Sequence, residues 1–216
     1  PVVRTATIAL FIVQAVSIGL SVYLPIYMQL FLHLSVADSG TALLGLMLGT
    51  VAGAMGSGRL VAHVTHYKRI ALIGMLLCAV CLVALGLSVH RPSLFLVEIL
   101  TIGAGIGWGT SFPISTISVQ NAVDCAHLGV ATGLMTFMRS LGGAMGVAAF
   151  GAIALGYGLP LGREGVTTSG AAAASPAAFG VIFLAGAGCI FVAFLFFSLM
   201  PEKPLQGAAE TPPVME

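Results

Sequence analysis

The sequence predicts an all-α fold, a polytopic membrane helix bundle with six transmembrane helices. Three observations carry this prediction. Of the 216 residues, 58% are hydrophobic and only 7% are charged, whereas soluble domains average roughly 25% charged residues. The mean hydropathy is +1.09, which leaves too few polar side chains to cover a water-soluble fold. The apolar residues also gather into six runs, each long enough to cross a bilayer, which takes about 20 residues.

The six predicted spans alternate with short polar connectors. The first span contains only Gln14 and Gln29 as strongly polar residues, and the others are interrupted by few charges. None shows the alternating pattern of a membrane β-barrel strand. In chain order the spans are Thr5–Leu32, Ser39–Val61, Ile70–Val89, Ser93–Val119, Leu128–Tyr157 and Ala177–Met200. The connectors are His33–Asp38, His63–Arg69, His90–Pro92, Asn121–His127 and a longer, flexible Gly/Ala/Ser/Thr loop, Gly158–Pro176.

Residues 1–203 are therefore expected to form one six-helix transmembrane unit, and residues 204–216 a disordered cytoplasmic tail. The chain begins at Pro1 rather than Met, and we interpret it as a fragment. Lysine and arginine favour the cytoplasmic side of membrane proteins. With both termini inside, the inner side holds Arg4, Arg59, Lys68, Arg69 and Lys203, and the outer side holds Arg91 and Arg163. This asymmetry predicts a cytoplasmic N-terminus and C-terminus.

Glycines repeat every fourth residue in several spans. Because four residues make about one helical turn, such glycines form a smooth strip against which a neighbouring backbone can pack closely. The pattern therefore predicts close helix packing, although static bundles and moving ones both use it. The strips are Gly45, Gly49 and Gly53 in the second span, and Gly129 with Gly133 and Gly142 with Gly146 in the fifth.

Arg139 is the most informative single residue of the sequence. It lies 11 residues after Leu128, which places it roughly 16 Å along the fifth span, near the middle of a core about 30 Å thick. Arginine at this depth costs at least ~2.5 kcal/mol, so it must face the bundle interior, a wet cavity or a counter-charge. Two interpretations stay open: a cavity residue that contacts substrate, or a structural arginine bonded to carbonyls of adjacent helices.

Four further residues are candidates for function. Gln14 is predicted to line a cavity or to form an interhelical hydrogen bond. Trp108 and Tyr23 could stack on an aromatic substrate, although aromatic residues in membrane helices more often serve packing. Glu98, near the start of the fourth span, is a candidate for coupling through a protonatable carboxyl, with an interfacial glutamate as the alternative.

Several function classes lack a signature in this sequence. There is no H-E-x-x-H, G-x-S-x-G or G-x-x-x-x-G-K motif, so we predict neither an enzyme nor a bound cofactor or metal. Cys78 and Cys81 form a C-x-x-C inside an apolar run and are interpreted as small packing residues. The net charge of +1 gives no basic field for nucleic acid.

Seven short stretches, taken in order and spacing, resemble the C-terminal half of the major facilitator superfamily. The closest resemblance is to fourteen-span drug:proton antiporters of the EmrB/QacA type, and it covers roughly residues 5–200. The stretches are Tyr23–Gln29, Ser39–Leu44, Gly56–Leu60, Tyr67–Arg69, Val119–Ala122, Leu128–Gly133 and Arg139–Gly143. The third and fourth resemble the second copy of the superfamily's signature loop, so Gly58, Arg59, Lys68 and Arg69 are expected to form a cytoplasmic gate.

The resemblance implies a secondary transporter in the plasma (inner) membrane. It would export small hydrophobic or cationic drugs in exchange for protons, by alternating access around a central cavity. Because six spans make one half, the missing N-terminal half is expected as its partner, together with the lipid bilayer. A non-transporting membrane scaffold or sensor is the alternative, and drug-dependent proton flux would distinguish the two.

Overall fold

The computed structural model describes residues 2–61, 67–90, 93–157, 159 and 176–199. These residues form helices and no strand, which confirms the predicted all-α class. Six helical spans among them are long and apolar enough to cross a membrane. The elements are α1 (Val2–Phe31), α2 (Val36–Val61), α3 (Tyr67–Ser88), α4 (Leu94–Gly109), α5 (Ser111–Gln120), the 3-10 turn η1 (Cys125–His127), α6 (Leu128–Gly156) and α8 (Pro176–Ser198).

Two predicted connectors are shorter than expected because helices begin inside them. Helix α2 begins at Val36, where Ser35 caps it: the Ser35 hydroxyl accepts a hydrogen bond from the Asp38 backbone N–H at 3.1 Å. Helix α3 begins at Tyr67, so Lys68 and Arg69 belong to its first turn rather than to a loop. The predicted tail 204–216, and all of the loop 158–176 except residues 159 and 176, lie outside the described residues.

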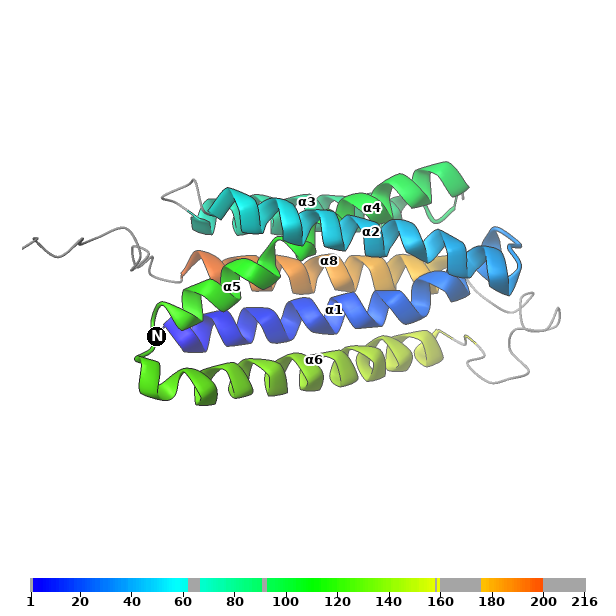
Figure 1. Cartoon of the computed structure of the whole chain (residues 1–216). Coiled ribbons are helices and arrows are strands. Elements are labelled where there is room, and N and C mark those ends of the chain that lie inside the picture. Colours follow the sequence, from blue (N-terminus) through cyan, green and yellow to red (C-terminus); the bar gives the residue numbers. More distant parts are fainter. Residues whose placement is uncertain (1, 62–66, 91–92, 158, 160–175, 200–216) are drawn as a thin grey trace, which may run out of the picture.

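The fourth predicted span is two helices rather than one. Helix α4 ends at Gly109 and α5 begins at Ser111. Pro113 explains the break, because it has no N–H to donate and its ring crowds the carbonyl four residues earlier, which is that of Gly109. Figure 1 shows the consequence: α5 leaves the line of α4 and crosses the bundle toward α1 and α6.

Helix α1 lies at the centre of the bundle. It packs against α6, α8, α5 and α2, while α3 and α4 complete the bundle by packing against α8 and α2 respectively (Figure 1). Consecutive spans run in opposite directions, so the beginnings of α1 and α3 lie at the same end as the last turns of α2 and α8. Lys68 shows this directly, since its Nζ donates to the carbonyl oxygen of Ser198 at 2.6 Å.

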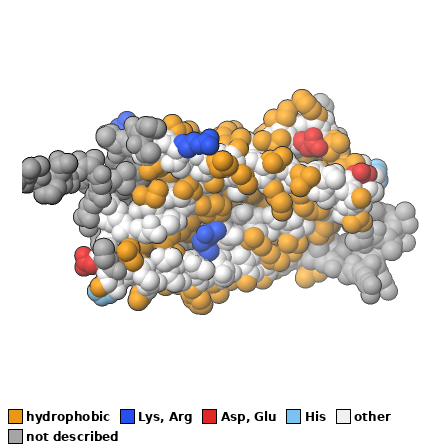
Figure 2. Space-filling view, in the orientation of Figure 1, with side chains coloured by type: hydrophobic (Ala, Val, Ile, Leu, Met, Phe, Trp, Pro, Cys, Tyr) orange, Lys and Arg blue, Asp and Glu red, His pale blue; other side chains and the backbone are white. Residues whose placement is uncertain are grey.

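The outer surface of the bundle is apolar. Ile73, Phe95 and Val130 are 68%, 73% and 74% exposed, and hydrophobic side chains cover much of the face that carries α2, α1, α5 and α6 (Figure 2). In water such a surface would aggregate, whereas in lipid it is the favoured exterior. Together with the six spans, it makes this chain an integral, multi-pass membrane protein.

Glycines bring several helix backbones into direct contact, among them those of α2 with α4 and of α6 with α1. A Cβ on Gly49 would lie 2.5 Å from the Ile102 carbonyl oxygen, and one on Gly53 would collide with that of Ile106, so α2 rests directly on α4. Gly142 and Gly146 face the carbonyl oxygens of Phe11 and Ala15 in the same way, joining α6 to α1. Gly45 meets only the side chain of Ile102, at 3.2 Å, and Gly129 and Gly133 have no described atom within 4 Å of such a Cβ.

Gly146→Ala should lower the stability of the bundle, because its new methyl group would force α6 away from α1. We expect overpacking to cost about 1–3 kcal/mol, measured as a lower melting temperature of the full-length protein in lipid nanodiscs. Gly133→Ala on the same helix is the matched control. It should leave the melting temperature unchanged or raise it, since alanine is about 1 kcal/mol better than glycine within a helix. Equal losses in both variants would contradict the proposed contact.

Candidate functional site

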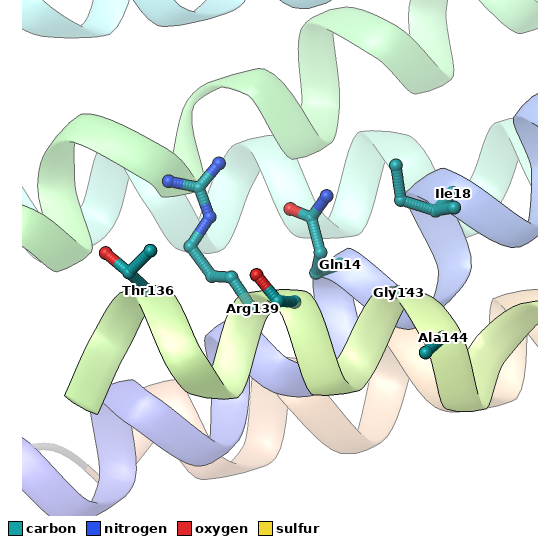
Figure 3. A pocket seen from close by; sticks show the side chains of 7 residues that line it. Gln14, Ile18, Thr136, Arg139, Gly143 and Ala144 are labelled. Carbon is teal, nitrogen blue, oxygen red and sulfur yellow. The ribbon is translucent and has the colours of Figure 1, made fainter. Parts of the chain in front are cut away.

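A cavity of about 460 Å³ lies between the middle of α1 and the middle of α6. Its volume falls within the range of about 300–1,000 Å³ that is typical of small-molecule sites. Helix α1 contributes Gln14 and Ile18, and α6 contributes the rest of the wall (Figure 3). The α6 residues are Thr136, Arg139, Ser140, Gly143 and Ala144, whose spacing of three and four residues keeps them on one helical face.

Arg139 enters this cavity rather than bonding to carbonyls of adjacent helices. In Figure 3 its side chain extends from α6 toward α5, beside that of Gln14 from α1. Its Cζ lies 4.7 Å from the centre of the Phe112 ring, a cation–π contact. Phe112 directly precedes Pro113, so the break that redirects α5 also places this ring against the guanidinium.

Gln14 supplies a polar atom without a partner. Its Oε1 is buried and accepts no hydrogen bond from the described residues. Leaving a buried acceptor unpaired costs about 1–3 kcal/mol, and unpaired groups of this kind are commonly explained by a water, an ion or a ligand. The cavity wall thus combines one cation with a neighbouring side chain whose acceptor has no described partner.

A second, smaller cavity of about 340 Å³ lies on the α2 side of α1. Trp108 contributes to its wall but is only 1% exposed, and its Nε1–H donates to the Thr50 hydroxyl at 2.8 Å. Ser17 and Ser21 from α1 line the same cavity. Trp108 is therefore held in place by α2 and exposes almost none of its ring to a ligand.

Tyr23 lines neither cavity. It is 4% exposed, packs edge-on against Phe150, and donates from its hydroxyl to the Val147 carbonyl oxygen at 3.3 Å. These contacts join the second half of α1 to α6. The tertiary structure thus places Tyr23 in helix packing, the alternative that the sequence left open for aromatic residues.

The remaining candidates lie away from the cavities. Glu98 is half-buried in the second turn of α4 and lines neither cavity. Gly58 and Arg59 are exposed in the last turn of α2, and Arg69 is exposed in the first turn of α3. Lys68 is half-buried against the end of α8. The four gate residues therefore gather at one end of the bundle, whereas Arg139 and Gln14 meet at mid-depth.

Sequence reasoning missed three residues beside Arg139. Thr136 and Ser140 share its helical face, and this could have been found by following the three- and four-residue spacing from Arg139 along the span. Phe112 comes from another helix, and nothing in the sequence pairs it with Arg139 except the proline that follows it. His63 and His66, interpreted as loop residues, lie outside the described residues; within these, no group of three or more His, Cys, Asp or Glu side chains could hold a metal ion.

These features define a class: a multi-pass membrane helix bundle with a polar cavity between helices at mid-depth. The family model of the Major Facilitator Superfamily matches residues 1–147, more than half of the chain. The chain therefore belongs to the Major Facilitator Superfamily, as its sequence motifs indicate.

Curated relatives extend this comparison. The chain is 28% identical over 150 residues, covering 67% of the chain and 43% of the relative, to a tetracycline resistance determinant of Streptomyces rimosus. It is 30% identical to the multidrug transporter protein MdtP of Bacillus subtilis, covering 62% of the chain and 25% of the relative. Multidrug resistance protein 3 of Bacillus subtilis is 25% identical, with 69% and 29% covered. The chain thus spans less than half the length of these relatives.

Thr50→Val should destabilise the contact between α2 and the fourth span. It leaves the buried Trp108 N–H without its acceptor, at a cost of about 1–3 kcal/mol, and we expect a lower melting temperature. Thr50→Ser keeps the hydroxyl and should stay close to the parent protein. Because Trp108 is the only tryptophan of this chain, its emission spectrum, recorded on this chain, checks the same contact: only Thr50→Val should shift it. Identical melting temperatures and spectra in both variants would contradict the hydrogen bond.

Proposed function

We propose that this chain is the C-terminal half of a drug:proton antiporter of the EmrB/QacA type. In this proposal it exports small hydrophobic compounds by alternating access. The single observation that carries the proposal is the cavity between α1 and α6, which has the size of a small-molecule site and lies near mid-depth. Membership of the superfamily supports transport, and the similarity to a tetracycline resistance determinant and to a multidrug transporter supports drug efflux.

A complete transporter of this design has two halves. The substrate site of such transporters lies near the bilayer midplane, at the interface between repeats, and rocking of one half against the other exposes it to each side in turn. The face that carries α2, α1, α5 and α6 offers an apolar surface with the cavity in it (Figure 2). We propose that the N-terminal half packs against this face and closes the cavity.

The gate and the orientation belong to the same proposal. Arg4, Arg59, Lys68 and Arg69 lie at one end of the bundle, and basic residues favour the cytoplasmic side. We place this end at the cytoplasmic face of the plasma (inner) membrane, with both termini inside. There the basic side chains would contact the N-terminal half when the transporter is closed to the cytoplasm.

The proposed proton coupling uses carboxylates that lie outside the α1–α6 cavity. The lining of the α1–α6 cavity includes no aspartate or glutamate. Glu98 is the candidate within this half, and the N-terminal half is expected to supply further protonatable groups. The energy for export would come from a proton gradient, because proton entry would drive the rocking of the two halves in one direction.

The full-length protein should transport a neutral hydrophobic amine, N-phenyl-1-naphthylamine, across liposome membranes when a pH gradient is imposed. A protonophore should abolish this movement by collapsing the gradient. Dye movement is followed by fluorescence, with protein-free liposomes as the reference. A rate equal to that of protein-free liposomes, with or without the gradient, would overturn the proposed function.

Ser140→Trp tests whether the cavity is the transport site. The indole would fill space beside Arg139, and losing about 1.4 kcal/mol of substrate binding corresponds to a tenfold effect, so we expect transport at subsaturating dye to fall about tenfold or more. Val130→Trp is the matched control, since Val130 is 74% exposed on the same helix and outside the cavity. Equal rates in the two variants would place the site elsewhere.

A further inference from the structure

Among the residues that the structure describes, no acidic side chain pairs with the positive charge of Arg139. The described acidic residues are Asp38, Glu98 and Asp124, and each lies in an early helical turn or a connector rather than at the depth of Arg139. On the face shown in Figure 2, acidic side chains lie toward the two ends of the bundle. The other acidic residues of the sequence are Glu164, Glu202, Glu210 and Glu216, none of which falls within a predicted span.

The contact with Phe112 leaves the bonding edge of Arg139 unused. The Phe112 ring attracts the guanidinium by a cation–π contact, and it has no oxygen that could accept a hydrogen bond from the N–H groups of Arg139. Among the described residues, none accepts a hydrogen bond from these N–H groups or forms an ion pair with them. A guanidinium edge in this state matches the two oxygens of a carboxylate or sulfonate, to which it donates parallel hydrogen bonds.

Gln14 adds a second requirement, a hydrogen-bond donor on the ligand. Its Oε1 is a buried acceptor without a described partner, while other atoms of the Gln14 side chain line the same cavity as Arg139, so a rotation of the terminal amide would present the oxygen to a ligand. Ile18 and Ala144 form an apolar part of the wall. The cavity therefore complements an apolar molecule that carries both an anionic group and a hydrogen-bond donor.

From this arrangement we infer that the cavity binds organic anions: amphiphilic compounds with a carboxylate or sulfonate that pairs with Arg139, and an N–H or O–H that donates to Gln14. The inference rests on the proposed function and narrows its substrate class. It departs from the cationic compounds that the family resemblance suggests, because an uncompensated guanidinium at low dielectric repels a cation and attracts an anion.

Two dyes that differ by one sulfonate provide the test. These are 8-anilinonaphthalene-1-sulfonate and N-phenyl-1-naphthylamine, and both carry the same anilino N–H. Binding to the full-length protein in nanodiscs is measured by fluorescence, after subtraction of the signal from empty nanodiscs. The parent protein should bind the sulfonate at least about tenfold more tightly than the neutral dye, the magnitude expected of a charge-assisted pair.

The variants separate the two contacts. Arg139→Gln should remove the preference for the sulfonate, by weakening the binding of that dye at least about tenfold more than the binding of the neutral dye, whereas Arg139→Lys should keep part of the preference. Gln14→Leu should weaken both dyes by a similar factor, because both lose the acceptor for their N–H. Val130→Ala is the control: it changes an exposed side chain on the same helix as Arg139, outside the cavity, and should change neither affinity.

Three outcomes would overturn the inference. The parent protein could bind both dyes equally, and this result would exclude an anion preference even if a variant fails to fold. Arg139→Gln could weaken both dyes equally. It could also leave sulfonate affinity unchanged, as expected when a carboxylate elsewhere in the full-length protein already neutralises Arg139. Transport of the neutral dye is scored separately, so failure of the proposed function is distinguished from failure of the anion preference.

Discussion

The direct backbone contact between α1 and α6 is the constraint on which the candidate site depends. Gly142 and Gly146 have no side chain to hold the helices apart, so they rest on the carbonyl oxygens of Phe11 and Ala15. This contact fixes the register of the two helices. In this register Gln14, which lies between Phe11 and Ala15 in the chain, stands opposite the face of α6 that carries Arg139 and Gly143.

The same principle joins α2 to α4, with a different result. Gly49 and Gly53 bring the two backbones together, and Thr50, between them, reaches Trp108 across the interface. A hydrogen bond inside such a bundle both satisfies a buried N–H and sets the rotation of the helices. Helix α1 therefore has a cavity on each side, and each adjoins a pair of helices in close contact.

The proline break of the fourth span connects these two regions. Had α4 continued straight, Phe112 would belong to the same straight helix as the residues of α4. Because Pro113 cannot bond to Gly109, the chain turns and α5 crosses to α1 and α6, where Phe112 meets Arg139. One imino acid thus determines what lies against the guanidinium at mid-depth. Arg139 lines the cavity there, and no described carboxylate pairs with it.

The sequence by itself determined the class of the protein and the number of spans, because apolar runs of bilayer length have no other stable arrangement and the backbone must satisfy its own hydrogen bonds in lipid. It also determined that Arg139 is exceptional, since burial of a charge has a cost that can be assigned from depth alone. Only the tertiary structure decided which glycines are contacts: Gly146 meets the backbone of Ala15 and Gly133 meets no described atom, although both belong to pairs with the same spacing. It also decided that Tyr23 packs against α6, that the fourth span consists of two helices, and that Phe112 and Gln14 lie beside Arg139. These outcomes depend on which helices are neighbours and at what rotation, and the pattern along one helix does not contain that information.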